Sequence, residues 1–356
     1  MNSRRVGRTE LFVSEMGLGG IKFPGIDQHT VSRVVGEAID NGISIIDTAR
    51  GYGDSEEKLG LALEGRRDEV VLVTKSPARD AEGMRRDIET SLRNLRTDHI
   101  DIYLTHNLRR PEVYEKATAD GGALQALERA QKEGLIGHVG ISCHRYHETL
   151  QRAIESGRFD VIMVAYNILN DELMDEEIMP MAKEHDIGTL IMKPLGGGVL
   201  AEAGGRFRLE GEGLPEGPIG APGAIRFVLA NPHADCVLVG MKSVEELRED
   251  LGAIRPGQRY TQEEMDALQE AAEDLGRDMC RACGYCQPCP QGILIPIVLR
   301  HLFYAREFGL EEWARGRYSM VEVKADSCER CGECEEKCPY DLPVMDLLEE
   351  AHCLLG

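Results

Sequence analysis

Cysteine spacing gives the strongest chemical signal in this chain. Eleven cysteines are present, and most of them lie in two short runs near the C-terminus. The first run is Cys280, Cys283, Cys286 and Cys289, and the second is Cys328, Cys331, Cys334 and Cys338. A proline follows each run, and the second run has the C-x2-C-x2-C-x3-C-P spacing with which ferredoxin-type loops bind 4Fe-4S clusters. We therefore predict that the cysteines of both runs are iron ligands.

Closely spaced cysteines could also form disulfides or hold zinc. Disulfides are disfavoured, because the N-terminal sequence has no apolar signal segment and bridges between near neighbours close only short loops. Structural zinc usually takes two C-x2-C pairs separated by a longer loop, whereas here four cysteines follow one another twice. Clusters are the interpretation that we adopt.

We predict that the two runs exchange their fourth ligands. The last cysteine of each run would bind the cluster of the other run, as in two-cluster ferredoxins. One cluster would take Cys280, Cys283, Cys286 and Cys338, and the other would take Cys328, Cys331, Cys334 and Cys289. The first run departs from the usual pattern between its third and fourth cysteines, so a single cluster with spare thiols is the alternative.

A second set of reactive side chains follows short apolar runs in the long N-terminal part. Asp47 and Lys75 each end such a run, Tyr52 lies in the loop after the first, and His106 follows a third. A phenol is a weak acid at neutral pH, but a nearby ammonium stabilises the phenolate and a buried carboxylate keeps the ammonium charged. These residues suit carbonyl reduction, with Tyr52 as the acid, Lys75 tuning it, Asp47 holding Lys75 and His106 orienting the substrate oxygen.

The elements that would position these residues repeat along the chain. Eight apolar segments, each followed by a helical pattern, predict an α/β fold, the (β/α)8 TIM barrel, whose active site lies at the C-terminal ends of the strands. The predicted strands are Met16 to Gly19, Ile43 to Asp47, Val70 to Lys75, Ile100 to Leu104, Ile136 to Ile141, Val161 to Ala165, Thr189 to Met192 and Val237 to Val239. A doubly wound sheet is disfavoured, because Gly17, Gly19 and Gly20 do not give the G-x-G-x-x-G spacing.

Length and composition set the domain organisation. A chain of 356 residues suits one large domain and one small one. We predict the barrel over 1–258, with a helix over Thr30 to Asn41 and a Gly- and Pro-rich insertion at 201–222. Residues 259–356 would form a helical connector and a small ferredoxin-like domain, with a helical segment around Arg300 to Arg315.

Charge and hydropathy limit the partners. Lys and Arg total 41 against 62 Asp and Glu, and the net charge of −21 argues against nucleic acid. The sequence has no run as long as the ~20 apolar residues of a membrane span and no secretory signal. We expect a cytoplasmic protein that does not bind membranes and that acts on a small-molecule carbonyl substrate.

These motifs resemble the aldo-keto reductase superfamily. The matching segments are 46–53 with Ser55 and Glu56, Thr74-Lys75, 101–106, and Gly140-Ile141-Ser142. With its cysteine runs, the chain is similar to the subgroup that carries a C-terminal ferredoxin-like iron–sulfur domain. The resemblance implies NAD(P)H-dependent reduction of a carbonyl, or its reverse, by a tetrad of Asp47, Tyr52, Lys75 and His106.

The resemblance also implies a nicotinamide pocket. Ser142 would contact the carboxamide, while Cys143 and Met163 stand where the family usually has Asn and Gln, and Met192 stands where an aromatic residue would stack. The phosphate end would lie near Gly240, Lys242 and Ser243, where a helix begins. The family's downstream arginine and asparagine align with Glu246 and Asp250, so NADH and NADPH both stay open.

Three functions are compatible with two redox modules in one chain. The clusters would pass electrons between the barrel and an electron-transfer protein, or they would only stabilise the small domain of a carbonyl reductase. The third is a redox-sensing or nicotinamide-binding protein with structural clusters and little turnover, which the altered pocket favours.

Overall fold

The structure is a computed structural model, and it describes two compact units. The first comprises Met1–Gly197 and Ala221–Met265, and the second comprises Gly198–Gly220 and Asp266–Gly356. All residues are described except 109–110, 145, 169–172, 197–199, 202–219, 255–260, 264, 268–279, 281–285 and 339–341, together with the side chains of 307 and 308. Most of the predicted insertion and the predicted boundary after residue 258 therefore lie outside the described residues.

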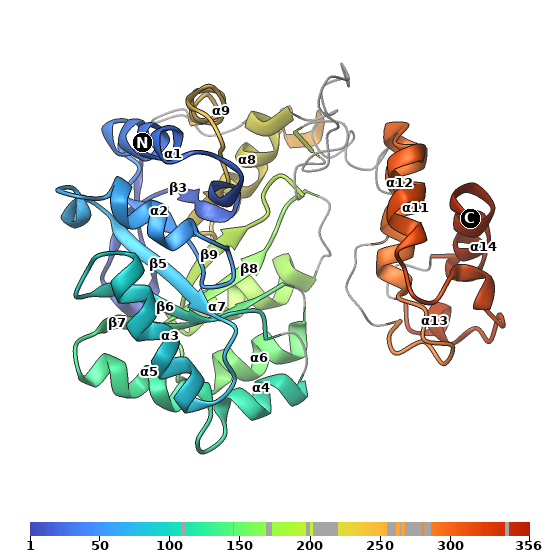
Figure 1. The fold of residues 1–356 in the computed structure, drawn as a ribbon, viewed down its shortest axis with the longest axis horizontal. Coiled ribbons are helices and arrows are strands. Elements are labelled where there is room, and N and C mark those ends of the chain that lie inside the picture. Colours follow the sequence, from blue (N-terminus) through green and yellow to red (C-terminus); the bar gives the residue numbers. More distant parts are fainter. Residues whose placement is uncertain are drawn as a thin grey trace. The chain divides into compact units, whose positions relative to one another are not determined.

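Eight parallel strands close into a barrel in the first unit (Figure 1), as predicted. The strands are β3 (Met16–Gly19), β4 (Ile45–Asp47), β5 (Val71–Ser76), β6 (Ile100–Thr105), β7 (Ile136–Cys143), β8 (Val161–Ala165), β9 (Gly188–Met192) and β10 (Cys236–Val239). β10 pairs with both β9 and β3, which closes the sheet. All eight predicted strands are present, and their ends differ from the predicted ones by two residues at most.

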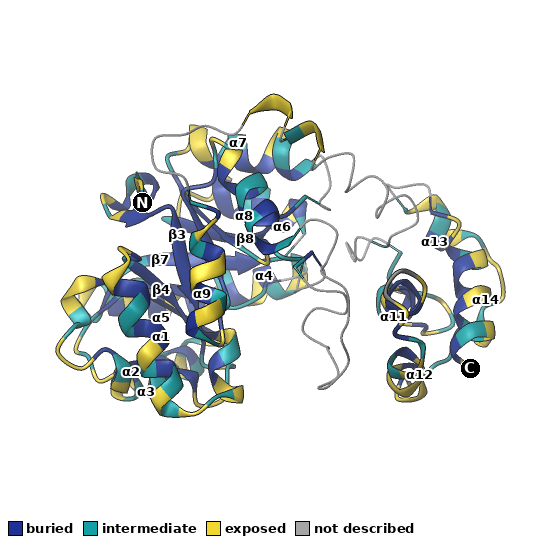
Figure 2. Ribbon diagram, turned by 90° about the horizontal axis from the view of Figure 1, so that it is seen from above, coloured by how far each residue is buried: buried dark blue, intermediate teal, exposed yellow. Residues whose placement is uncertain are grey.

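Helices cover the outside of the barrel, with their buried faces toward the strands and their exposed faces outward (Figure 2). They are α1 (Gln28–Asp40), α2 (Ser55–Ala62), α3 (Ala81–Asn94), α4 (Pro111–Thr118), α5 (Ala123–Lys132), α6 (His147–Glu155), α7 (Met179–Glu184), α8 (Gly220–Ala230) and α9 (Val244–Leu251). The predicted helix over Thr30 to Asn41 begins two residues earlier. The cause is Asp27, whose carboxylate accepts a hydrogen bond from the Thr30 amide at 3.0 Å and so caps the helix.

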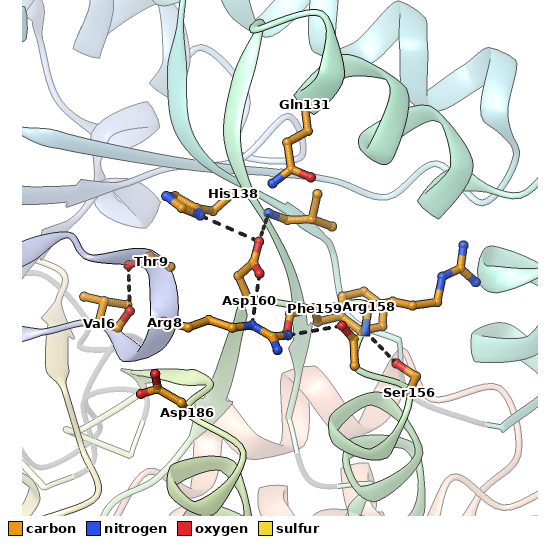
Figure 3. Close-up of polar contacts among 12 residues, drawn as sticks. Val6, Arg8, Thr9, Gln131, His138, Ser156, Arg158, Phe159, Asp160 and Asp186 are labelled. Carbon is orange, nitrogen blue, oxygen red and sulfur yellow. Dashed lines mark hydrogen bonds and ion pairs between the residues drawn. The ribbon is translucent and has the colours of Figure 1, made fainter.

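A short hairpin closes the N-terminal end of the barrel, which the sequence analysis did not predict. Strands β1 (Ser3–Arg5) and β2 (Phe12–Ser14) pair antiparallel, and Val6 and Val13 join the apolar core inside the barrel. Arg8 lies in the connecting turn and donates to Asp160 at 3.2 Å and to the Phe159 carbonyl at 2.5 Å (Figure 3). Backbone and side-chain hydrogen bonds therefore fasten this end of the barrel.

The second unit is helical. Its described helices are α11 (Ile295–Phe308), α12 (Glu311–Ser319), α13 (Glu333–Glu336) and α14 (Val344–Leu355). The single helical segment expected around Arg300 to Arg315 is in fact two helices. Gly309 separates them with a φ of 62°, a left-handed conformation that favours glycine. None of the helices in the described parts of the chain is long and apolar enough to cross a membrane.

Candidate active site and cluster site

The alternation of side chains along the strands places the predicted residues on the inside of the barrel. Ile45, Val73 and Leu104 belong to the apolar core inside the barrel. Asp47, Lys75 and His106 lie two residues further along β4, along β5 and just beyond β6, so they face the same interior at its C-terminal end. Ser142, Met192 and Gly240 occupy the equivalent positions on or directly after β7, β9 and β10.

A buried ion pair lies at the centre of this arrangement. Lys75 is 1% exposed, and its Nζ donates to both oxygens of Asp47 at 2.5 and 2.7 Å and to the Thr48 carbonyl at 2.9 Å. Burial alone would lower the pKa of Lys75, but the negative charges of Asp47 and of an ionised Tyr52 oppose burial and raise this pKa above its ordinary value. The ammonium therefore stays protonated at neutral pH.

Tyr52 and His106 lie beside this ion pair. Lys75 Nζ is 5.0 Å from the centroid of the Tyr52 ring, and the Tyr52 and His106 rings meet edge to face with centroids 5.8 Å apart. A Cβ at Gly51 would lie 3.9 Å from the His106 imidazole, so the loop that carries Tyr52 also passes close to His106. The structure thus brings together all four residues of the predicted tetrad.

A buried carboxylate behind the tetrad received no role in the sequence analysis. Glu56 is 1% exposed and accepts hydrogen bonds from Arg50 at 2.6 Å, from Thr74 at 2.8 Å and from Ser91 at 2.7 Å. It joins the loop between Asp47 and Tyr52 to the strand that carries Lys75. Its position in the sequence could have indicated that Glu56 is buried, because it shares a helix face with buried Leu59 and Gly60.

The residues expected around a nicotinamide ring are largely buried. Ser142 is fully buried, and its Oγ accepts a hydrogen bond from the Asn107 amide at 2.8 Å. Met192 is half-buried and packs against the core inside the barrel, which includes Met163. Cys143 belongs instead to the outer core between strands and helices. Of these four residues, Ser142 and Met192 are therefore the ones whose side chains lie at the C-terminal end of the barrel interior.

The segment after β10 forms a helix cap. Ser243 is the N-cap residue of α9, and its Oγ accepts a hydrogen bond from the Glu246 amide at 3.2 Å. The Glu246 carboxylate in turn accepts from the Lys242 amide at 2.8 Å and lies 3.3 Å from Lys242 Nζ. The S-x-x-E sequence is a capping-box signal that the sequence analysis did not use, although the Glu246 carboxylate accepts here from the amide of Lys242, one residue before the N-cap.

Cysteines from both runs surround one cavity in the second unit. It is partly open to solvent. The cysteines that line it are Cys286, Cys289, Cys328, Cys331 and Cys334. The set includes all four ligands predicted for the second cluster, among them Cys289 from the first run. The amide of Arg330 donates a hydrogen bond to Cys328 Sγ at 3.4 Å.

The cavity fits a cluster in its chemistry. Cys289, Cys328, Cys331 and Cys334 form no disulfide, and Ile295, Met345 and Leu348 give the cavity apolar walls. Cysteine thiolates in apolar surroundings are the usual ligands of 4Fe-4S clusters. The residues present therefore suit a 4Fe-4S cluster.

The remaining cysteines of the predicted set are less completely described. Cys280 and Cys338 are half-buried and pack against the apolar core of the second unit, while Cys283 lies outside the described residues. The described part of the chain thus brings together one of the two predicted ligand sets.

Comparison with known proteins agrees with both halves of the chain. The Aldo/keto reductase family model matches residues 15–208, and a 4Fe-4S dicluster domain model matches residues 279–343. The uncharacterized oxidoreductase YrpG of Bacillus subtilis is 30% identical over 300 residues, which cover 70% of this chain and 90% of that protein. The NADH-specific methylglyoxal reductase of Escherichia coli is 30% identical over 229 residues, 55% of this chain and 68% of that protein.

A solved structure supports the same assignment. The holo form of aldo-keto reductase AKR11C1 from Bacillus halodurans is 27% identical and has a TM-score of 0.64, covering 76% of this chain and 96% of that one. This chain belongs to the aldo/keto reductase family. It is an oxidoreductase of that type with a C-terminal 4Fe-4S dicluster domain.

Proposed function

We propose that this protein reduces a small-molecule carbonyl with NAD(P)H, or catalyses the reverse reaction, at the C-terminal end of the barrel. The observation that carries the proposal is the geometry of Lys75, which is held by Asp47 at 2.5 Å and lies 5.0 Å from the ring centroid of Tyr52. A permanently charged ammonium beside a phenol is what a tyrosine needs to act as an acid near neutral pH.

Each residue of the tetrad has a separate task. The nicotinamide cofactor supplies the hydride when bound. Tyr52 Oη gives its proton to the carbonyl oxygen of the substrate, and Lys75 stabilises the phenolate that remains. Asp47 keeps Lys75 protonated, and the imidazole of His106 orients the substrate oxygen by hydrogen bonding. Glu56 positions the Tyr52 loop through Arg50, which donates to it at 2.6 Å.

The cofactor would extend across the C-terminal end of the barrel. Ser142 would hold the carboxamide, with Met192 against the nicotinamide ring through its polarisable sulfur. Gly240, Lys242 and Ser243 would lie at the phosphate end, since the last loops of such barrels commonly bind phosphate. Support comes from their positions at or just after the ends of β7, β9 and β10.

The cysteines of both runs would hold two 4Fe-4S clusters, with the ligand exchange predicted from their spacing. When bound, such clusters supply one-electron transfer. Their role here would be to exchange electrons with an electron-transfer protein, in a domain spanning 259–356 that follows the barrel of 1–258 in the sequence. The reducing cytoplasm suits such thiol-rich sites.

A second candidate is a nicotinamide-binding redox sensor with structural clusters and little turnover. The observation that favours it is the altered nicotinamide pocket, in which Met192 stands where the family usually has a stacking aromatic residue.

Replacement of Tyr52 by Phe tests the enzyme proposal. Loss of the proton donor should lower the rate of NADH- or NADPH-dependent reduction across a panel of aldehydes and ketones by about 10²–10⁴-fold. Dinucleotide binding should be unchanged. Tyr114→Phe is the matched control, because Tyr114 lies on α4 and its hydroxyl donates to the Arg152 carbonyl. Unchanged turnover in Tyr52→Phe would disprove the tetrad, and no turnover in the unaltered holoprotein would favour the sensor.

Anaerobic titration with NADH and, separately, NADPH tests the electron-transfer part of the proposal. We expect the visible absorbance of the clusters to bleach if electrons pass from nicotinamide to iron. A persistent band would leave the clusters structural or reduced by another protein.

A further inference from the structure

An arginine connects two loops at the C-terminal end of the barrel. Arg79 lies in the loop after β5 and is half-buried. Its Nη2 donates to the backbone carbonyl of His106 at 2.6 Å and to that of Asn107 at 3.3 Å, and its Nη1 donates to the Ala78 carbonyl at 3.2 Å. Because His106 belongs to the tetrad, the guanidinium of Arg79 lies at the edge of the candidate active site.

The loop that Arg79 contacts also reaches the next strand of the barrel. Asn107 follows β6 with a left-handed φ of 61°, and its Oδ1 lies 2.8 Å from Nδ1 of His144, which follows β7. The Asn107 amide donates to Oγ of Ser142 at 2.8 Å. The loops after β5, β6 and β7 therefore meet here, and such loops form the substrate-binding mouth of barrels of this type.

The positive charge of Arg79 is not neutralised by the chain. Its acceptors are neutral carbonyls, and in the described parts of the chain no neighbouring charge opposes burial, which lowers the pKa of Arg79. Arginine nevertheless stays protonated in proteins. A partly buried charge without a counter-ion is unfavourable, and an anionic ligand would offset that cost through charge-assisted hydrogen bonds.

Arg67, at the opposite end of β5, provides a comparison. It donates to the carbonyls of Val70 at 2.9 Å and of His99 at 2.8 Å, so it also holds two backbone segments together. Arg67 in addition binds the Asp101 carboxylate at 2.7 Å. The two arginines contact the backbone in the same way, and among the described residues Arg67 alone of the two has a carboxylate partner.

We propose that Arg79 selects carbonyl substrates that carry a carboxylate. The inference rests on the proposed function, because it names the substrate class of the same site. The described acceptors use three of the five N–H groups of Arg79, which leaves two for a ligand. The planar guanidinium matches the geometry of a carboxylate. A net charge of −21 repels anions from the protein as a whole, so binding one requires a local cation.

Paired aldehydes test the inference. Succinic semialdehyde and 4-carboxybenzaldehyde are each compared with their methyl esters, which keep the aldehyde and lack the charge. In the anaerobic holoprotein with saturating NADH or NADPH, kcat/KM should be at least about tenfold higher for one of the acids than for its ester. Arg79→Gln should lower kcat/KM for that acid by about 10–100-fold, mainly through KM, and for its ester by less than about threefold. Arg79→Lys keeps the charge and should restore part of the preference.

Arg67→Gln is the matched control, because it removes a guanidinium that also holds two backbone carbonyls. It should change the rates for acid and ester by the same factor. Esters reduced as well as the acids by the unaltered protein, or a parallel loss for both in Arg79→Gln, would overturn the inference and leave Arg79 with a structural role. Turnover of other aldehydes without either acid would overturn it too. If the unaltered holoprotein reduced no aldehyde or ketone at all, the proposed function itself would fail, and the inference with it.

Discussion

The two units of this protein hold their reactive groups in opposite ways. In the barrel, Lys75 is fixed by Asp47 and by the Thr48 carbonyl, all within 2.9 Å. In the second unit, thiols line a cavity, and one of them, Cys331, is exposed. The barrel site is organised by folding alone, whereas the cysteine site is arranged to be completed by an inorganic group.

The difference follows from how much apolar core each unit has. The barrel has one core inside its strands and another between strands and helices. The described residues of the second unit form a smaller core that includes Cys334 itself and packs against Cys289 and Cys328. Small domains often depend on metal for their stability, because their cores bury too little apolar surface. Here the predicted ligands and the core are partly the same residues.

Removal of iron should therefore destabilise the second unit and leave the barrel folded. This is the largest effect that we expect. Anaerobic chelation should abolish the visible absorbance and raise amide hydrogen exchange in α11–α14 by orders of magnitude, because ligand binding is folding free energy in such domains. Exchange in β3–β10 should stay protected. Equal loss of protection in both units, or in neither, would contradict the comparison.

The exposed cysteines provide a matched pair for the same experiment. Cys331→Ser should lose a cluster, because Cys331 lines the cavity. Cys353→Ser changes another exposed thiol, near the end of α14, that belongs to neither run, and it should keep the full iron content.

Asp250 is an exception within the barrel unit, because burial beside like charges is unfavourable for its carboxylate. Burial, together with the charges of Glu249 and Glu246, raises the pKa of Asp250 to about 8. The folded state therefore binds a proton that the unfolded state releases near pH 3.9, so stability falls as pH rises from about 4 to 8. Asp250→Asn should flatten this part of the profile and stabilise the barrel at pH 8 by on the order of 2–4 kcal/mol.

Urea unfolding at pH 5 and pH 8 measures this effect. Glu245→Gln is the control, since it removes a charge from an exposed position near the start of the same helix. If the unfolding free energy of Asp250→Asn fell between pH 5 and pH 8 as steeply as that of the unaltered protein, another group would be responsible for the pH dependence.

The sequence predicted the barrel and its tetrad because both depend on local patterns. Apolar runs mark the strands, and alternation alone places Asp47 and Lys75, which end two of the predicted runs, on the interior face. The crossing of Cys289 to the second run also follows from spacing, and the structure brings these cysteines to one cavity.

The features that were missed depend on contacts between distant segments or on single residues. Glu56 binds Thr74 and Ser91, which lie on two other elements. The closing hairpin depends on Val6 and Val13 entering a core that the other strands form. The break at Gly309 is one glycine within an otherwise continuous helical pattern.

The two ends of the barrel give the last and smallest test of the comparison. Asp160, at the N-terminal end, accepts from Arg8 at 3.2 Å and from the Val139 amide at 3.1 Å (Figure 3). Burial alone would raise the pKa of Asp160, but His138, Val139 and Arg8 outweigh burial and lower it. Because these contacts tie down an end remote from Tyr52, Asp160→Asn should cost about 1–2 kcal/mol in unfolding free energy and leave turnover within about twofold.

Asp160 and Asp250 should contribute to the unfolding free energy with pH dependences of opposite sign. A carboxyl whose pKa is lowered by folding stabilises the protein above its unfolded pKa, near 3.9, and loses that contribution as pH falls through its folded pKa. The difference between Asp160→Asn and the unaltered protein should therefore persist at pH 5 and shrink below about pH 4. Asp186→Asn is the matched control, because its ion pair with Arg5 is exposed and should contribute less to stability than the contacts of Asp160 do. A loss of turnover in Asp160→Asn as large as that in Tyr52→Phe would show that the N-terminal end also serves the reaction.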